Sequence, residues 1–396
     1  MKYVIVDFGA KYQYTHHQPL VNSYAKIIQG TNNVPILYLS KYADRSIYSA
    51  MPGEKRFILT DVVYGPTAKE SFFKSLLLFL SGLILESKTN DNILKRVYKY
   101  FLTHKVKREL LLLCREANEE VFIIFPTSEP LSFYLARSLL NEPRNKYFKF
   151  RFRIVGGESR GFLSSLDELT NLAKLTNSYP DQILVGYETK RYMELLISNG
   201  FNSEILRWSP WPPMVDSSVI CDQINTKVVL GFLGNAKKRK GFDSLPILLK
   251  LLSELGLNFQ AIIQPAIFEW EDYQETINML NKLFPERILI TEPELSLKQL
   301  LEYISISNLL VLPYDKSSYS INASGLLYHG SDYQVPAITL EGVGFEDEIK
   351  DFKIGILASD LQDMAVKIMN FDKKNYHFEE YNRARFQATV SFILSS

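Results

Sequence analysis

The segment Asn308–Ile338 has the sequence NLLVLPYDKSSYSINASGLLYHGSDYQVPAI. It opens with the apolar run 309–312, closes with a second apolar run that ends at Ile338, and carries a helical pattern between them. Short apolar runs bounded by turn residues are typical of the buried strands of a parallel sheet. The segment therefore predicts a strand, a helix and a second strand, which is the repeating unit of an α/β protein.

The turn before the expected helix is rich in small residues. Asn322, Ala323, Ser324 and Gly325 stand directly before Leu326. A small-residue turn that enters a helix leaves backbone N–H groups free at the positive end of the helix dipole, where a phosphate can bind. The alternative is that Asn322 or Ser324 merely caps the helix.

A second segment, Val228–Leu251, has the sequence VVLGFLGNAKKRKGFDSLPILLKL. An apolar strand runs into a turn with Gly234 and Asn235, and the four cations 237–240 follow, with Gly241 before an apolar helix. Four cations at one junction repel each other unless solvent or an anion lies nearby. Either the turn is solvated, or one or two of these cations hold a diphosphate and Gly241 lets the backbone pass close to it.

Together, the two segments resemble the C-terminal domain of a GT-B glycosyltransferase, most closely the GT4-like group of retaining enzymes. That group has a strand–Gly–(Arg/Lys)…Lys-Gly–helix segment, which Lys237 and Lys240-Gly241 match here. It also has Pro-Tyr, Ser-Gly and Pro-Val motifs, which are matched by Pro313-Tyr314, Ser324-Gly325 and residues 335–337. The resemblance implies two Rossmann-like, doubly wound parallel-sheet domains that face a cleft.

Three positions depart from the family pattern. The Glu-x7-Glu motif is absent: by spacing, Ile321 stands at the first Glu, which contacts the sugar in the family, and His329 stands at the second, which contacts the ribose. Gln334 replaces the usual Gly before the last strand. His329 can still donate or accept one hydrogen bond.

The resemblance implies a donor site in the second half of the chain. Lys237, Lys240 and the N–H groups of residues 324–326 would neutralise the diphosphate leaving group, and such charge stabilisation lowers the barrier of a transfer reaction. In the family the base rests against a loop that corresponds to 291–297, although a plain solvated loop is the alternative here. The expected donor-binding residues are Gly234, Asn235, Lys237, Lys240, Glu294, Tyr314, Asn322, Ser324, Gly325, Leu326 and His329.

Two loops of the first half follow expected strands, 2–8 and 121–125, at the edge where an α/β sheet binds ligands. Their polar and small residues are Gly9, His16, His17, Thr127 and Glu129. We expect the first four to line the acceptor cleft, although a plain surface loop is the alternative for the histidines. We expect Glu129 to be catalytic, by contacting the acceptor hydroxyl or the transferring sugar; the alternative is a carboxylate that favours a helix start.

The region 69–110 is helical and unusually apolar in its first part. The stretch 72–85 is too short to span a bilayer and is interrupted by Lys74 and Gly82. Basic and aromatic residues then alternate as far as Arg108. Such a pair of helices either lies on an anionic membrane surface, which would suit a lipid-linked acceptor, or is a buried helix beside a solvated one.

Composition excludes several other classes. The net charge of +1 gives no argument for nucleic acid as a partner, and Cys114 and Cys221 do not form a metal knuckle. The five histidines form no metal-ligand pattern and no Asp-x-Asp motif occurs, so we expect neither a metal nor a resident cofactor. The first residues read as a strand rather than a signal peptide, which fits a cytoplasmic protein.

The chain length of 396 residues predicts two or three domains. The proline-rich stretch Trp208–Pro213 predicts an interdomain linker, with a boundary near Asp216. We therefore expect an acceptor-binding domain at 1–215, a nucleotide-sugar-binding domain at 216–374, and a helix at 375–396 that crosses back to the first domain. Alternating strands and helices in both halves predict parallel sheets with right-handed crossovers.

The expected function is transfer of a sugar from a nucleotide-diphosphate donor, of UDP or GDP type, to a glycan or lipid-linked acceptor in surface polysaccharide or glycoconjugate synthesis. Retention of configuration follows from the resemblance. The main alternative is a catalytically degenerate GT-B subunit that binds a partner enzyme or glycan, because both family carboxylates are missing. A sugar-nucleotide epimerase would need clustered acidic and histidine residues in the cleft, and a dinucleotide-dependent oxidoreductase would need a Gly-x-Gly-x-x-Gly motif after the first strand.

Overall fold

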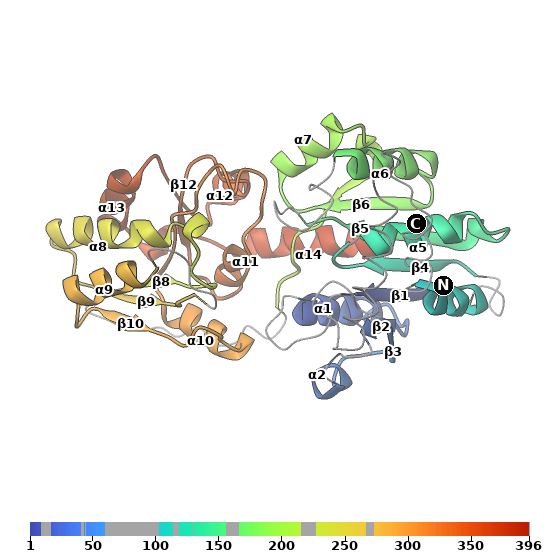
Figure 1. Cartoon of the computed structure of the whole chain (residues 1–396), viewed down its shortest axis with the longest axis horizontal. Helices are drawn as coiled ribbons and strands as arrows, with labels where there is room; N and C mark the ends of the chain where they lie inside the picture. The colour runs from blue at the N-terminus through green and yellow to red at the C-terminus, as the bar shows by residue number, and fades with distance from the viewer. Residues whose placement is uncertain are drawn as a thin grey trace, which may run out of the picture.

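The computed structural model describes residues 1–8, 17–40, 43, 45–59, 103–113, 119–128, 130–155, 166–214, 227–266 and 273–395. In these residues the chain forms two parallel sheets, one of seven strands and one of six, with helices packed on them (Figure 1). This architecture confirms the predicted fold class of two Rossmann-like, doubly wound domains.

The first sheet has the strand order β3-β2-β1-β4-β5-β6-β7, and all of its strand pairs are parallel. Its central strands β1, β2 and β4 are mainly apolar and buried, as expected where helices cover both faces of a parallel sheet. The strands are β1 (Lys2–Asp7), β2 (Ile36–Ser40), β3 (Glu54–Leu59), β4 (Val121–Phe125), β5 (Phe148–Arg153), β6 (Ile183–Tyr187) and β7 (Leu206–Trp208). Its helices are α1 (His17–Gln29), α2 (Arg45–Ser49), a helical stretch at 103–113, α5 (Pro130–Leu140), α6 (Leu166–Ser178) and α7 (Lys190–Ser198).

The second sheet has the order β10-β9-β8-β11-β12-β13, again with parallel pairs throughout. Its strands are β8 (Val228–Phe232), β9 (Phe259–Ile263), β10 (Ile288–Ile290), β11 (Leu309–Leu312), β12 (Ala337–Leu340) and β13 (Gly355–Ala358). The helices that follow are α8 (Leu245–Glu254), α9 (Tyr273–Leu283), α10 (Leu297–Ile306), α11 (Gly325–Asp332), α12 (Glu346–Phe352), α13 (Leu361–Met369) and α14 (Glu379–Leu394).

Each sheet has a switch point in its strand order. In the first sheet β1 lies between β2 and β4, and in the second sheet β8 lies between β9 and β11. In doubly wound sheets, ligands bind outside the carboxyl ends of the strands at such a switch point. The loops after β1 and β4, and those after β8 and β11, are therefore where the fold itself places binding residues.

Element boundaries differ from the predicted ones by a few residues. Helix α7 begins at Lys190, because the Thr189 side chain caps it by accepting a hydrogen bond of 3.2 Å from the Tyr192 amide. The tail predicted as helical from Asn375 becomes α14 only at Glu379, after a short 3-10 turn.

The predicted membrane-contact region 69–110 lies mostly outside the described residues. Its last part is helical, with Val106 and Leu110 buried against the first sheet and His104, Lys105 and Arg108 exposed. No helix among the described residues is long and apolar enough to cross a bilayer.

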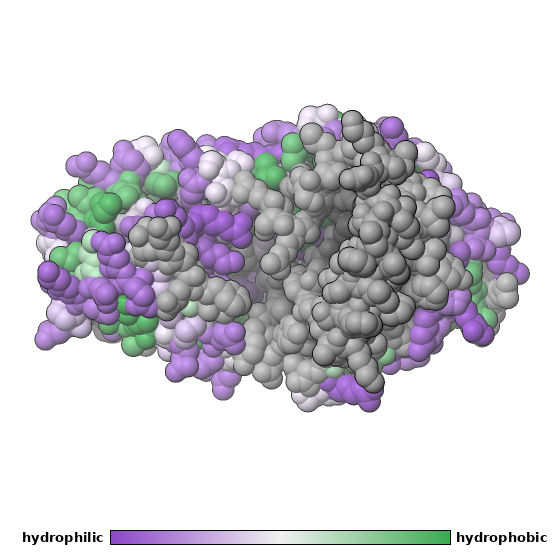
Figure 2. All heavy atoms as spheres, viewed as in Figure 1, coloured by the Kyte–Doolittle hydropathy of each residue, from purple (hydrophilic) through white to green (hydrophobic). Residues whose placement is uncertain are grey.

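Figure 2 shows hydrophilic side chains interspersed with apolar patches over the second domain.

The last helix, α14, joins the two halves of the molecule (Figure 1). Near its start, Tyr381 belongs to the core of the second domain, whereas Phe392 and Ile393 near its end lie in the core between α1 and the first sheet. The carbonyl of Ser395 then accepts a hydrogen bond from the guanidinium of Arg151 in β5.

Arg385, in the middle of α14, is fully buried and connects this helix to α11 and to the linker. Its guanidinium donates to Asp332 Oδ1 at 2.9 Å, to Ser331 Oγ at 2.6 Å and to the Trp211 carbonyl at 2.8 Å. It also stacks over the Tyr328 ring at 4.9 Å from the centroid. A buried cation with this many partners fixes the relative positions of α11, α14 and the linker.

Replacing this cation should destabilise the protein strongly. Arg385→Met leaves Asp332 buried without its counter-ion, which typically costs about 3–5 kcal/mol. The matched control is Arg383→Met, because Arg383 is exposed on the same helix and its loss should change stability by less than about 0.5 kcal/mol. Urea unfolding followed by tryptophan fluorescence measures both, and equal midpoints would contradict the role of Arg385.

Candidate functional site

The turn that follows β8 is held in an unusual backbone conformation. Gly234 has φ 85° and Asn235 has φ 58°, so two successive residues are left-handed. Glycine adopts this conformation without a steric penalty and asparagine tolerates it better than most residues. The amides of both residues point to one acceptor, the side-chain oxygen of Gln264 at the end of β9, at 2.6 and 3.0 Å.

Lys240 folds back over this turn. Its ammonium donates a hydrogen bond to the Gly234 carbonyl and lies 6.0 Å from the centroid of the Tyr314 ring. Burial, together with the positive charges of Lys237 and Arg239, lowers the pKa of Lys240 to about 7. Among the residues that the structure describes, no carboxylate pairs with this ammonium, so a bound anion would stabilise its protonated form.

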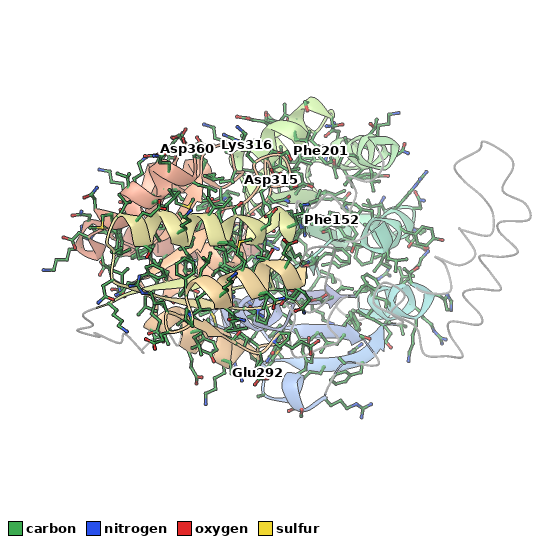
Figure 3. The ribbon with its side chains drawn as sticks, turned by 60° about the vertical axis from the view of Figure 1, so that its left-hand side comes forward. Phe152, Phe201, Glu292, Asp315, Lys316 and Asp360 are labelled. Carbon is green, nitrogen blue, oxygen red and sulfur yellow. The ribbon has the colours of Figure 1, made fainter. Side chains whose placement is uncertain are left out.

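The cation segment packs closely on the loop after β11. Gly241 has φ 73°, and a Cβ atom at this position would lie 2.0 Å from the Pro313 carbonyl oxygen. The Asp315 amide donates to the Arg239 carbonyl at 3.0 Å, and the Arg239 guanidinium stacks on the Tyr319 ring at 5.5 Å. Figure 3 labels Asp315 on this loop and Glu292 on the loop after β10, on the other side of the sheet's switch point.

The N-terminus of α11 opens at the same place. Ser324 is its N-cap residue but makes no side-chain capping hydrogen bond, and the Leu326 side chain approaches within 2.9 Å of the Cβ position of Gly234. The first amides of a helix have no intrahelical partner and carry partial positive charge. The Lys240 ammonium and the start of α11 thus form one positively polarised site beside the turn after β8.

The other predicted donor residues lie around this centre. Tyr314 is buried, which raises its pKa, and its ring packs against Tyr319 at 4.3 Å. Asn322 is also buried: its side-chain nitrogen donates to the Ser318 carbonyl at 3.1 Å, whereas its Oδ1 has no partner among the described residues. Lys237 and Glu294 are exposed, on the cation segment and on the loop after β10.

His329 lies on the side of α11 that faces the linker. It is 6% exposed and meets the Trp211 ring edge-on at 5.5 Å. Burial lowers its pKa to about 4, with the charge of Arg385 contributing, so the imidazole is neutral at pH 7. Both side chains line a small pocket against α1 of about 10 Å³, roughly the space of one water molecule.

Ile321, at the first family Glu position, contacts the first domain. Its side chain packs against the core of the first sheet, and its carbonyl accepts a hydrogen bond of 2.7 Å from the Thr189 hydroxyl. Close by, Arg191 donates to the Gly342 carbonyl at 2.6 Å and pairs with Glu346 at 3.0 Å. These contacts hold the loops after β11 and β12 against α7 and its N-cap residue.

The structure describes some of the residues that were predicted to line the acceptor cleft. Thr127 follows β4 and is 8% exposed, and its hydroxyl, like that of Ser128, has no hydrogen-bond partner among the described residues. Gly9, His16 and Glu129 lie outside the described residues, and His17 begins α1 without a described side chain. Thr127 is therefore the predicted acceptor residue whose surroundings the structure defines.

Sequence reasoning missed a buried ion pair below this edge. Arg153 at the end of β5 pairs with Glu188 at the end of β6, and it also donates to the carbonyls of Ser209 and Pro126 at 2.8 and 3.2 Å. The signal was an arginine inside the apolar strand FKFRFR, which demands a partner once it is buried. The pair joins β4, β5, β6 and the start of the linker.

None of the protein-family models matches the chain, and none of the curated proteins matches it significantly. Solved structures do match. Anabaena HepE in complex with UDP is 14% identical, with 99% of this chain and 95% of that chain covered and a TM-score of 0.60. Sucrose-phosphate synthase from Thermosynechococcus elongatus is 12% identical (98% and 95% covered, TM-score 0.58). A glycosyltransferase from Rickettsia africae is 13% identical (100% of both chains, TM-score 0.55).

These alignments extend over nearly the whole of both chains, and they include both sheets and the helix that joins them. The chain therefore has the GT-B fold, the two-domain architecture of this class of glycosyltransferases. The resemblance of the two sequence segments to GT-B enzymes is confirmed at the level of the fold.

The close approach of Gly241 to Pro313 can be tested by comparing alanine substitutions at Gly241 and at Gly256. Gly241→Ala should cost at least about 2 kcal/mol more than Gly256→Ala, because both glycines are left-handed but only the first has a carbonyl where Cβ would be. Gly256, with φ 81°, has no atom within 4 Å of that position. Urea midpoints of the two variants measure the difference, and equal values would show that the cation segment is not held against Pro313.

Proposed function

We propose that the protein is a glycosyltransferase that uses a nucleotide-diphosphate sugar, of UDP or GDP type. The observation that carries the proposal is Lys240, a half-buried cation with a depressed pKa, placed beside the N-terminus of α11 at the switch point of the second sheet. Basic side chains and helix N-termini are the groups that bind phosphates. A diphosphate supplies the negative charge that this site lacks.

The proposed reaction follows from this placement. The bond between the anomeric carbon and the phosphate oxygen breaks, the nucleoside diphosphate leaves with the bonding electrons, and the acceptor oxygen forms the new bond and loses its proton. Lys240 and the first amides of α11 stabilise the charge on the leaving group, and Lys237 adds a further cation from the exposed side. In this scheme no metal ion is needed to neutralise the leaving group. Retention of configuration and membership of the GT4-like group remain part of the proposal.

The neighbouring structures suggest which donor to try first. The HepE structures were determined with UDP, with UDP-glucose, and with UDP and glucose. They support UDP as the first probe for this chain, and a hexose as the first sugar.

The acceptor is proposed to be a glycan or a lipid-linked sugar that binds at the loops following β1 and β4. The unpartnered hydroxyls of Thr127 and Ser128 could accept or donate hydrogen bonds to a sugar there. Gly9, His16 and His17 are proposed to line the same edge, and Glu129 is proposed to contact the reacting sugar. Peripheral membrane contact through 69–110, on the cytoplasmic face, is proposed together with a lipid-linked acceptor.

Thermal-shift measurements with UDP, GDP, ADP, CMP and dTDP test the donor site. One diphosphate at 100 times its Kd should raise the unfolding midpoint by about 5 °C, because it binds only the folded protein. Lys240→Ala should abolish the shift, whereas Lys238→Ala, an exposed neighbour, should keep most of it. No shift with any of these nucleotides would remove the proposed donor site and favour a non-catalytic GT-B subunit.

The depressed pKa of Lys240 makes nucleotide binding depend on pH. Below pH 7 the ammonium is already protonated, whereas above pH 7 the bound diphosphate must raise its pKa and recruit a proton. Binding should therefore take up close to one proton at pH 8.5, and Kd should rise by up to about tenfold per pH unit. Calorimetry in two buffers of different ionisation enthalpy counts this proton. Lys240→Arg stays charged and should take up none; uptake by this variant equal to the wild type would assign the proton to another group.

A further inference from the structure

Gln264, which stands directly after β9, connects two loops with a single side chain. It is 6% exposed, its Oε1 accepts from the amides of Gly234 and Asn235 at 2.6 and 3.0 Å, and its Nε2 donates to the Pro293 carbonyl at 2.9 Å. The first loop is the turn after β8, and the second is the loop after β10. One carboxamide group therefore joins loops that are almost sixty residues apart, a separation that local sequence does not bridge.

The chemistry of these contacts requires a carboxamide. Two N–H donors on one side need an acceptor oxygen, and a carbonyl on the other side needs an N–H donor, so the orientation of the amide is fixed by its partners. A carboxylate could accept from the turn but could not donate to Pro293, and an apolar side chain could do neither. Successive amides that converge on one oxygen form a concave, positively polarised site, and the Gln264 oxygen occupies this one and fixes the turn.

The sheet order indicates what the second loop faces. The order β10-β9-β8-β11-β12-β13 is that of the dinucleotide-binding fold, in which the phosphates lie at the switch point and the ribose lies near the end of the second strand. With a diphosphate between β8 and β11, the nucleoside extends over the ends of β9 and β10. Gln264 then lies between the turn after β8 and the loop 291–296, to which its Nε2 donates a hydrogen bond.

We infer that Gln264 is a positioning residue that couples nucleoside recognition to diphosphate binding. This inference rests on the proposed donor site, and it goes further by naming the group through which the two parts of a nucleoside diphosphate are bound together. With Gln264 intact, the loop 291–296 is held at a fixed distance from the turn that faces the phosphates. If the Nε2 amino group is lost, the turn after β8 keeps its two hydrogen bonds to the side chain, whereas the loop 291–296 loses its hydrogen bond.

The variant Gln264→Glu separates the two halves, because a carboxylate keeps the two contacts to the turn and loses the contact to Pro293. The readout is the ratio of Kd for inorganic pyrophosphate to Kd for UDP, which isolates the share of binding that the nucleoside contributes. This ratio should fall by about tenfold, as expected for the loss of one ordered contact. Gln260→Glu, on the same strand, adds the same charge without touching either loop and should leave the ratio unchanged.

Hydrogen exchange without any ligand tests the role of Gln264 independently of the proposed function. Hydrogen exchange of the amides in 291–296 should accelerate at least about fivefold in Gln264→Glu but not in Gln260→Glu. An unchanged exchange rate together with an unchanged affinity ratio would overturn the coupling. If the wild type bound neither pyrophosphate nor UDP, the proposed donor site would fail, and the exchange rates alone would decide whether Gln264 holds the two loops together.

Discussion

An ammonium group that is withdrawn from water is stabilised by negative charge beside it. In the described part of the second domain, Lys240 has no carboxylate partner. Lys240 is held by the Gly234 carbonyl of a left-handed turn and by an aromatic ring, while three further cations stand on the same segment. Its depressed pKa is the physical sign of this imbalance. A diphosphate at the N-terminus of α11 would correct it, which is why the fold, the charges and the turn all favour the same ligand.

The surrounding structure keeps this cation in place by close backbone approach and by contacts between the domains. Gly241 passes against Pro313 at a distance that no side chain allows, which brings the cation segment onto the loop after β11. That loop is in turn held against the first domain by Thr189 and Ile321. On the other side, Arg385 in α14 fixes α11 to the linker. The two sheets therefore keep a defined relation, which the proposed transfer between two substrates would require.

The sequence predicted those features that rest on local signals. Apolar runs and glycine turns located the strands, and the cation run with Gly241 located the turn at which the structure places Lys240. Contacts between distant residues could not be predicted, because a single side chain does not reveal its partner: Arg153 with Glu188, Arg385 with Asp332, and Gln264 with two loops are examples. Spacing alone placed Ile321 at a sugar-contacting position, whereas tertiary packing buries it partly against the first domain.

The position of a bound diphosphate tests the central claim most directly. A crystal structure of the protein with UDP should place oxygens of the β-phosphate about 3 Å from Lys240 Nζ and from the first amides of α11, as hydrogen bonding requires. The bond from Lys240 to the Gly234 carbonyl should then be weakened or exchanged for the phosphate. A β-phosphate bound away from Lys240, with the ammonium still on the Gly234 carbonyl, would contradict the account.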